Sequence, residues 1–263
     1  MAPTYLDKIV AAHRARAASD SRDWRTRSVT PSGSSLAEAL RLHRPEGNAV
    51  IAEVKRKSPS KGWLNEHLDP AQLAVSYVAG GASAISVLTD VPHFAGSEAD
   101  LQLVRAAVEV PILRKDFTVS VNDVLDTVEM GASAVLLIVA ALTLDELREF
   151  HDVAISCGID ALVEVHDVAE AERALSIGAT LIGVNQRDLH SFAVDAERAE
   201  KVASFLPEHV VAVAESGFSS SDAVRRAAGS GFDAVLVGEN FVVASDPQDE
   251  VASFVGFPIG ERS

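Results

Sequence analysis

A glycine-led phrase recurs along this chain and constrains its fold more than any other feature. It reads Gly81-Ala-Ser-Ala-Ile-Ser-Val-Leu, then Gly131-Ala-Ser-Ala-Val-Leu-Leu-Ile, and shorter versions begin at Gly158, Gly178 and Gly231. The gaps between these glycines are one or two multiples of about 25 residues, which is the length of a short βα unit. The repetition therefore predicts a fold built from many such units.

Each phrase has the composition of a helix end followed by a buried strand. Glycine closes a helix in the left-handed conformation, and the apolar run after it suits a strand of a parallel sheet, which is buried on both faces. Helical patterns separate the strands, and Pro247–Phe254 supplies the last helix. The eight predicted strands are Val50–Val54, Ala84–Leu88, Ile112–Lys115, Ala134–Val139, Ala161–Val165, Leu181–Asn185, Val210–Glu215 and Ala234–Gly238.

Eight βα units without a break favour an α/β protein, a closed (β/α)₈ TIM barrel. The chain has 263 residues, of which 48% are hydrophobic, so it can bury the core that one such barrel needs. We predict a single domain over residues 1–263, with the barrel at 49–254. A doubly wound open sheet is the alternative, although the sequence has neither the G-x-G-x-x-G nor the P-loop motif that would favour it.

The first 48 residues precede the barrel and predict an N-terminal helical extension. Tyr5–Ala18 reads as an amphipathic helix with Leu6, Ile9 and Val10 on one side. Residues 19–34 are polar and loop-like, and Ser35–Leu42 reads as a second helix with Ser35 as its cap. We expect this extension to pack over a barrel rim, where it either contributes to the active site or only covers the surface.

Charge and composition exclude several classes of function. The formal net charge of −15 argues against a nucleic-acid partner, and the Arg-rich stretch His13–Arg27 is interpreted as a solvated helix face and loop. The single cysteine, Cys157, excludes an internal disulfide and is expected to be a small core residue. The N-terminus has no apolar signal core, and the apolar run Ala134–Leu142 is too short to span a bilayer. We expect a cytoplasmic protein without a membrane partner; a monomer is expected, although the sequence does not determine oligomeric state.

Charged and amide side chains gather at the predicted carboxyl ends of the strands, where TIM barrels carry their active sites. Glu53 and Lys55 share one face of the first strand because they lie two residues apart. Lysines and glutamates that converge in a low-dielectric mouth perturb one another's pKa values, which suits general acid–base catalysis. A network of rim salt bridges is the competing interpretation. The remaining strand-end groups are Lys115, Glu164, Asn185, Glu215 and Glu239.

The last two strands end in the sequences Ser216-Gly217 and Gly238-Glu239-Asn240. TIM barrels often bind phosphate there through backbone N–H groups, and Arg187 adds a possible charge-assisted contact. The spacing is equally that of ordinary βα turns. No histidine or cysteine spacing indicates a metal site, no G-x-S-x-G motif is present, and His166 reads as a helix-start residue rather than a catalyst.

Together these residues form a recognisable pattern. The segments Ile51-Ala-Glu-Val-Lys-Arg-Lys-Ser-Pro-Ser-Lys-Gly62, Leu113-Arg-Lys-Asp-Phe117 and Leu162-Val-Glu-Val-His-Asp167 carry it most specifically, supported by Asn185–Leu189 and Ala214–Gly217. Over residues 5 to 254 the chain resembles indole-3-glycerol phosphate synthase, a carboxy-lyase of tryptophan biosynthesis. The resemblance implies a small-molecule substrate, 1-(2-carboxyphenylamino)-1-deoxyribulose 5-phosphate, which is closed to an indole with loss of carbon dioxide and water. It implies no cofactor and no metal.

The resemblance also implies roles for individual residues. Lys115 is the general acid that protonates the ketone oxygen, Glu164 handles a proton at dehydration, and Lys55 contacts the substrate carboxylate and is a candidate second acid. Glu53 and Asn185 hold polar substrate groups. Glu215 orients the lysines. The implied phosphate-side residues are Ser58, Arg187, Ser216, Gly217, Gly238 and Asn240, and the implied walls around the aromatic ring are Phe94, Phe117 and Leu136.

Three positions depart from the family pattern. Gln186 stands where a second Asn is usual, His93 replaces the first aromatic residue of a pair, and Asn240 lies in an altered Gly-Glu-Asn sequence. They bear on substrate affinity rather than on reaction type. Two other functions stay open: a phosphoribosylanthranilate isomerase, which needs a Cys–Asp pair at the strand ends, and a non-catalytic barrel that binds an indole or sugar phosphate.

Overall fold

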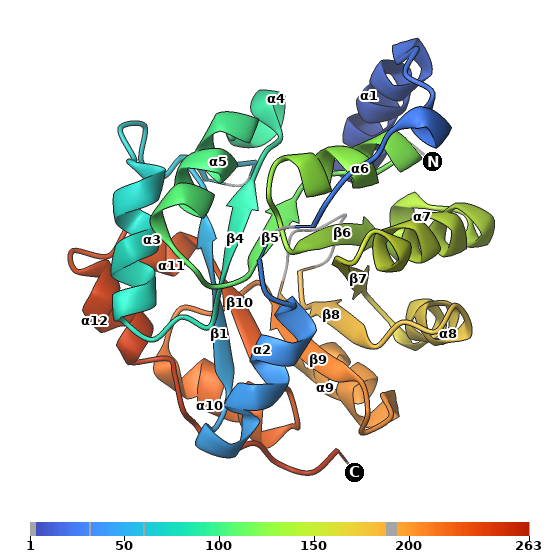
Figure 1. The fold of residues 1–263 in the computed structure, drawn as a ribbon. Coiled ribbons are helices and arrows are strands. Elements are labelled where there is room, and N and C mark those ends of the chain that lie inside the picture. The colour runs from blue at the N-terminus through green and yellow to red at the C-terminus, as the bar shows by residue number, and fades with distance from the viewer. Residues whose placement is uncertain (1–3, 32, 60, 188–193, 263) are drawn as a thin grey trace.

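The computed structural model describes residues 4–31, 33–59, 61–187 and 194–262. Eight parallel strands close into a barrel in the order β1-β10-β9-β8-β7-β6-β5-β4, with helices around it (Figure 1). The predicted TIM barrel is thereby confirmed, and the open sheet is excluded. The barrel strands are β1 Ala49–Val54, β4 Ala84–Leu88, β5 Ile112–Lys115, β6 Ala134–Ile138, β7 Asp160–Val165, β8 Leu181–Asn185, β9 Val211–Glu215 and β10 Ala234–Val237.

The predicted strands agree with these bounds to within a residue at each end. The glycines that open the repeated phrases adopt the expected left-handed backbone, with φ of 98° at Gly81 and 86° at Gly131. Each therefore ends a helix and turns the chain into the next strand. Three positions of the motifs quoted above, Ser60, Asp188 and Leu189, lie outside the described residues, as does His190.

Helices connect the strands, and most begin with a side-chain cap. Thr143, for example, accepts from the backbone N–H of Glu146, whose carboxylate accepts in return, so α7 starts with a complete capping box. The α-helices are α1 Tyr5–Ser19, α2 Leu36–His43, α3 Pro70–Ala79, α4 Val91–Phe94, α5 Glu98–Ala107, α6 Val121–Glu129, α7 Leu144–Ser156, α8 Val168–Ser176, α9 Ala196–Phe205, α10 Ser221–Gly229, α11 Glu239–Val242 and α12 Pro247–Ala252. The 3₁₀ turns are η1 Trp24–Thr26, η2 Arg44–Glu46 and η3 Val139–Ala141.

The hydrophobic core has two parts, as the geometry of a barrel requires. One part lies between the strands and the surrounding helices and includes Tyr77, Phe232 and Phe254. The other fills the inside of the barrel and includes Leu113 and Leu162. Leu36 and Leu40 of α2 belong to this inner cluster and are fully buried, so α2 contributes directly to the barrel interior.

The extension forms both predicted helices, and Ser35 caps α2 as expected. The Arg-rich stretch is different from the prediction: it is not merely a solvated face. Arg16 pairs with Asp123 at 2.6 Å, and Arg22 and Arg27 both pair with Asp126, so the stretch docks on α6, beside which α1 lies (Figure 1). Sequence patterning missed this because the acidic partners lie about a hundred residues away in the chain.

A small hairpin follows β1 and was not predicted. It pairs β2 Lys57–Ser58 with β3 Gly62–Trp63 in antiparallel register. Cys157 forms the C-cap of α7 and is half-buried against the outer core, in keeping with a packing role. Among the described residues, no helix is both long and apolar enough to cross a membrane.

Candidate active site

A cavity of ≈ 500 Å³ lies at the carboxyl ends of the barrel strands. This is the end at which TIM-barrel enzymes carry their active sites. The extension reaches it too, because Tyr5, Leu6 and Ile9 of α1 line the same cavity. All the site residues expected from the sequence line it: Glu53, Lys55, Ser58, Phe94, Lys115, Phe117, Leu136, Glu164, Asn185, Arg187, Glu215, Ser216, Gly217, Gly238 and Asn240.

Lys115 is the centre of a charged cluster in this cavity. Its Nζ lies 2.9 Å from Oε2 of Glu164 and 3.3 Å from Oε2 of Glu215. These residues lie at the carboxyl ends of β5, β7 and β9, so three separate strands hold one cation between two carboxyl groups. Asn185, at the end of β8, donates from Nδ2 to Oε1 of Glu164 at 3.0 Å. The side chains of Glu164 and Glu215 are buried, whereas that of Lys115 is 15% exposed toward the cavity.

This environment separates the pKa values of the two glutamates. Burial raises the pKa of Glu164, but the charge of Lys115 outweighs burial and brings that pKa to about 2. For Glu215 burial dominates over the attraction of Lys115, and the neighbouring Glu164 adds to it, so its pKa is raised to about 8. Burial would lower the pKa of Lys115, yet the surrounding carboxylates raise it. At neutral pH the site therefore holds a charged lysine, an ionised Glu164 and a protonated Glu215.

Glu53 and Lys55 form a second pair at the end of β1, where Nζ of Lys55 lies 2.6 Å from Oε1 of Glu53. Two glycines make room for the acidic groups. A Cβ added at Gly238 would lie 2.3 Å from Oε1 of Glu53, and one added at Gly183 would lie 1.9 Å from Oε1 of Glu215. A glycine inside a buried strand signals such a close approach, so Gly183 is a supporting residue that the sequence analysis missed.

Apolar side chains form another part of the lining. The rings of Phe94 and Phe117 lie 6.2 Å apart, centroid to centroid, and Leu136 and Ile138 of β6 also face the cavity. Phe94 is the last residue of α4, a short helix that Asp90 caps two residues after the end of β4. Charged groups on one side and flat apolar groups on another suit a ligand with both an aromatic ring and polar substituents.

The residues expected to bind phosphate line the cavity together with two cations, Lys61 and Arg187. Lys61 pairs with Glu239 at 3.1 Å. Burial raises the pKa of Glu239, but the positive charges of Lys55, Lys61 and Arg187 outweigh burial, so the pKa of Glu239 is lowered. Ser216 and Gly217 have left-handed backbones, with φ of 70° and 81°. The sequence analysis did not single out Lys61, whose position depends on the unpredicted hairpin.

The departures from the family pattern have structural explanations. Gln186 is buried and donates from Nε2 to the carbonyl of Ser216 at 3.1 Å, so it supports the turn after β9 from outside the cavity. His93 contacts Tyr5 edge to face. Asn240 lines the cavity, and its side-chain amide donates one hydrogen bond to Glu250 at 2.6 Å. His166 starts the turn into α8, with Nε2 3.7 Å from Oε1 of Glu164.

Solved structures similar to this chain are themselves barrels, and their sequence identity to it is low. Thiamine phosphate pyrophosphorylase from Pyrococcus furiosus has a TM-score of 0.58 at 17% identity, covering 80% of this chain and 95% of its own. N-acetylmannosamine-6-phosphate 2-epimerase from Clostridium perfringens has a TM-score of 0.60 at 14% identity, covering 80% and 93%. At these identities the likeness concerns the fold alone.

Sequence relatives are more specific. An indole-3-glycerol phosphate synthase of Nocardioides sp. is 53% identical over 213 residues, which are 81% of this chain and 82% of the relative. One of Streptomyces griseus is 51% identical over 212 residues, covering 81% and 79%. The family model described as indole-3-glycerol phosphate synthase matches residues 5–254, nearly the whole barrel and its extension. The chain therefore belongs to the indole-3-glycerol phosphate synthase family.

Proposed function

We propose that this cavity closes the indole ring of 1-(2-carboxyphenylamino)-1-deoxyribulose 5-phosphate, with Lys115 as the general acid. The family membership gives the activity, that of a carboxy-lyase producing indole-3-glycerol phosphate from a phosphorylated small molecule. The observation that carries the residue assignment is the buried contact of Lys115 with Glu164 at 2.9 Å, inside a cavity that also has an aromatic wall.

Ring closure needs a positive charge where the ketone oxygen becomes an alkoxide. A ring carbon attacks the ketone carbon, a carbon–carbon bond forms, and the electron pair of the C=O bond moves to oxygen. Lys115 is charged and faces the cavity, so it donates its proton to that strongly basic oxygen. The carboxylate then leaves as carbon dioxide, and its bonding electrons restore the aromatic ring.

Dehydration needs a base and an acid. Glu164 is ionised at neutral pH because Lys115 lowers its pKa, and it removes a proton from the carbon next to the ring nitrogen. The new hydroxyl leaves as water with a proton from Lys55, another lysine that lines the cavity. Electrons from the broken C–H bond form the carbon–carbon double bond of the indole. Glu215, protonated at neutral pH, keeps Lys115 oriented without competing for its charge.

The other lining residues position the substrate. Phe94, Phe117 and Leu136 contact the aromatic ring, and Glu53 and Asn185 hold its polar substituents. This arrangement folds the substrate so that ring carbon and ketone approach each other, which is an entropic contribution to catalysis. Phosphate is held by the basic end of the cavity, through Ser58, Arg187, Ser216, Gly217, Gly238 and Asn240.

The test is turnover of the substrate, followed by the fluorescence of the indole product, with EDTA present and no added cofactor. Every proton transfer above is assigned to a side chain, so the wild-type protein is expected to turn over under these conditions. Lys115→Ala should lose about three orders of magnitude or more in kcat, within the range that general acid–base groups contribute together with charge stabilisation. The matched control is Lys201→Ala on the exposed face of α9, which should be unaffected. Near-normal turnover by Lys115→Ala would overturn the assignment.

A further inference from the structure

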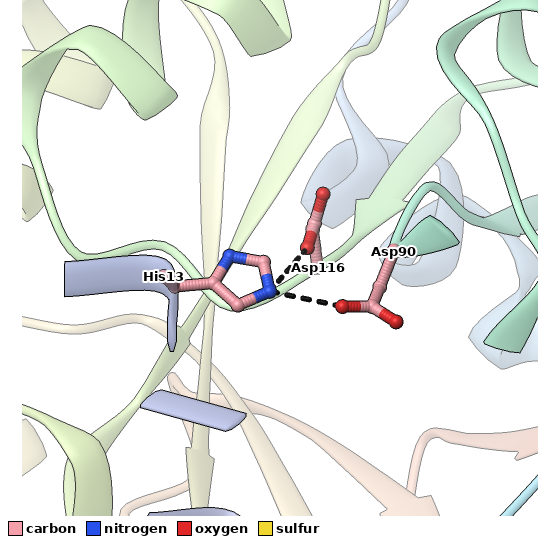
Figure 2. A group of neighbouring side chains, drawn as sticks. All are labelled: His13, Asp90 and Asp116. Atoms are coloured by element: carbon pink, nitrogen blue, oxygen red, sulfur yellow. Dashed lines mark hydrogen bonds and ion pairs between the residues drawn. The ribbon is translucent and has the colours of Figure 1, made fainter. Parts of the chain in front are cut away.

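His13 is buried although it belongs to the outer helix α1. Only 7% of it is exposed, and it lies one helical turn beyond Ile9, which lines the cavity. Its Nε2 points between two aspartates, 2.9 Å from Oδ2 of Asp90 and 3.9 Å from Oδ1 of Asp116 (Figure 2). The three residues come from α1, from the turn after β4 and from the turn after β5.

Each of these aspartates fixes the backbone of an aromatic wall residue. Asp90 accepts from the N–H of His93 at 2.7 Å and of Phe94 at 3.3 Å. Asp116 accepts from the N–H of Phe117 at 2.8 Å and directly follows Lys115 in the chain. The ring of His13 also contacts Phe117, with centroids 5.4 Å apart. His13 thus touches both supports of the aromatic wall at once.

We propose that His13 is a positioning residue, which fixes α1 and the Phe94–Phe117 wall over the aromatic ring of the substrate. This rests on the proposed placement of the ring against that wall. Its effect should fall on substrate affinity, because His13 acts on the wall and not on the proton-transfer groups. Asp116 adjoins Lys115, so a smaller effect on turnover is expected to accompany it.

The charges around His13 favour a hydrogen-bond donor at this position. Asp116 also accepts from Arg114 at 2.9 Å, which balances its charge inside the protein. Burial raises the pKa of Asp90, but hydrogen bonds from His13 and His93 outweigh it and bring that pKa to about 2. Asp90 is therefore an anion that needs donors, and His13 supplies one of them.

A bound metal ion is the competing explanation, because a histidine and two aspartates are possible ligands. All four carboxylate oxygens, however, already accept hydrogen bonds within the protein. The oxygens of Asp90 accept hydrogen bonds from His13, His93 and Phe94. The oxygens of Asp116 accept hydrogen bonds from Thr89, Arg114 and Phe117. A metal would have to displace several of these donors, so the hydrogen-bonded arrangement is the better account.

Steady-state kinetics of two substitutions test the proposal. His13→Leu removes the donor and should raise KM about tenfold to a hundredfold, the value of a buried hydrogen bond to a charged group, while kcat changes about threefold or less. His13→Gln keeps an N–H donor of similar reach and should recover most of the affinity. The control is His151→Leu, a histidine of α7 that is equally buried at 8% exposure and lies outside the cavity lining.

Three outcomes would overturn the proposal. They are an unchanged KM in His13→Leu, a KM effect as large in His151→Leu, and a rise in Tm on adding Zn²⁺ that disappears in His13→Gln. The last would assign the cluster to a metal. Fluorescence titration with indole-3-glycerol phosphate separates this proposal from the proposed function. Absence of wild-type turnover would count against the proposed function. Weakened binding of indole-3-glycerol phosphate in His13→Leu would still support the positioning role.

Discussion

The two ends of the barrel both contain buried ion pairs, but the pairs differ in what surrounds them. At the amino end of β10, Asp233 forms ion pairs with Arg44 of the extension and Arg262 of the C-terminal tail. It also accepts a hydrogen bond from the N–H of Ala212. Arg262 also donates to the carbonyls of Gly231 and Val210, at 2.9 and 2.8 Å. This cluster ties both terminal segments to the barrel.

At the carboxyl end the ion pairs face a cavity, and not all of their hydrogen-bonding atoms have a partner within the described part of the chain. Lys115 lies between two carboxyl groups, one with a lowered and one with a raised pKa. Oε1 of Glu215 is buried without a hydrogen-bond partner among the described residues. Lys/Arg–carboxylate pairs thus stabilise the fold at the amino end, where every charged group has its partners. At the carboxyl end, where charges are concentrated and open to a ligand, the same kind of pair suits catalysis. Substitutions at the two ends should therefore have opposite signatures.

Of the substitutions that compare the two ends, Glu164→Gln at the carboxyl end should have the largest effect. It removes the proposed base while keeping the side-chain shape, so kcat should fall about 10²- to 10⁴-fold. Lys115 is 15% exposed to the cavity and keeps Glu215 as a neighbour, so the loss in the free energy of unfolding should be smaller than that of breaking a fully buried pair. Glu172→Gln on the exposed face of α8 is the control and should leave kcat unchanged. A comparable loss in both variants would break the contrast between the two ends.

Arg262→Ala at the amino end should show the reverse signature. Removing one partner of a buried pair typically costs about 3–5 kcal/mol, and because Arg44 still reaches Asp233 we expect the lower end of that range. Urea denaturation measures the loss, and kcat at a temperature where the variant is folded should be near normal. Arg148→Ala, which removes a solvent-exposed pair, should cost about 1 kcal/mol or less. A selective loss of kcat in Arg262→Ala would contradict the structural role.

Gly183→Ala sharpens the account of the carboxyl end without touching a charge. The added methyl group would meet the carboxyl group of Glu215 and push it away from Lys115. Misplacement of this kind is expected to lower kcat about tenfold to a hundredfold. Gly229→Ala is a matched control, since a Cβ there meets nothing within 4 Å. Equal kinetics for the two variants would show that the clearance is unimportant.

The smallest effect concerns pH. The pKa of Glu215 is raised to about 8, so its proton is retained through neutral pH and lost as the pH rises above that value. An ionised Glu215 would compete with substrate for Lys115, so kcat should fall on the alkaline side, about tenfold by pH 9. Glu215→Gln cannot ionise and should lack this limb. An identical alkaline limb in that variant would assign the titration to another group.

Sequence patterning predicted the barrel well because local and global signals agree. Glycines such as Gly81 and Gly131 end helices by their backbone conformation, and apolar runs follow them directly. Strand ends then identify the cavity, since the carboxyl ends of all eight strands meet at one rim. The proposed residues lie together there, although their individual roles remain predictions.

The features that escaped prediction all depend on distant partners. His13 pairs with Asp90, which follows β4, and Arg16 pairs with Asp123 of α6. Both partners are distant in the chain, so no local sequence pattern predicts these pairs. The β2–β3 hairpin has strands of two residues, too short for a periodic signal. Gly183 was visible as a glycine within a strand, but its function follows only from the nearby carboxyl group of Glu215.

Chemical rescue of Lys115→Ala tests the central claim most directly. The variant has an empty volume beside Glu164 where an ammonium group was, and methylammonium is small enough to enter the cavity. If Lys115 is the general acid, turnover should be several orders of magnitude below wild type without the amine and should rise with its concentration. Near-normal turnover without the amine would contradict the account.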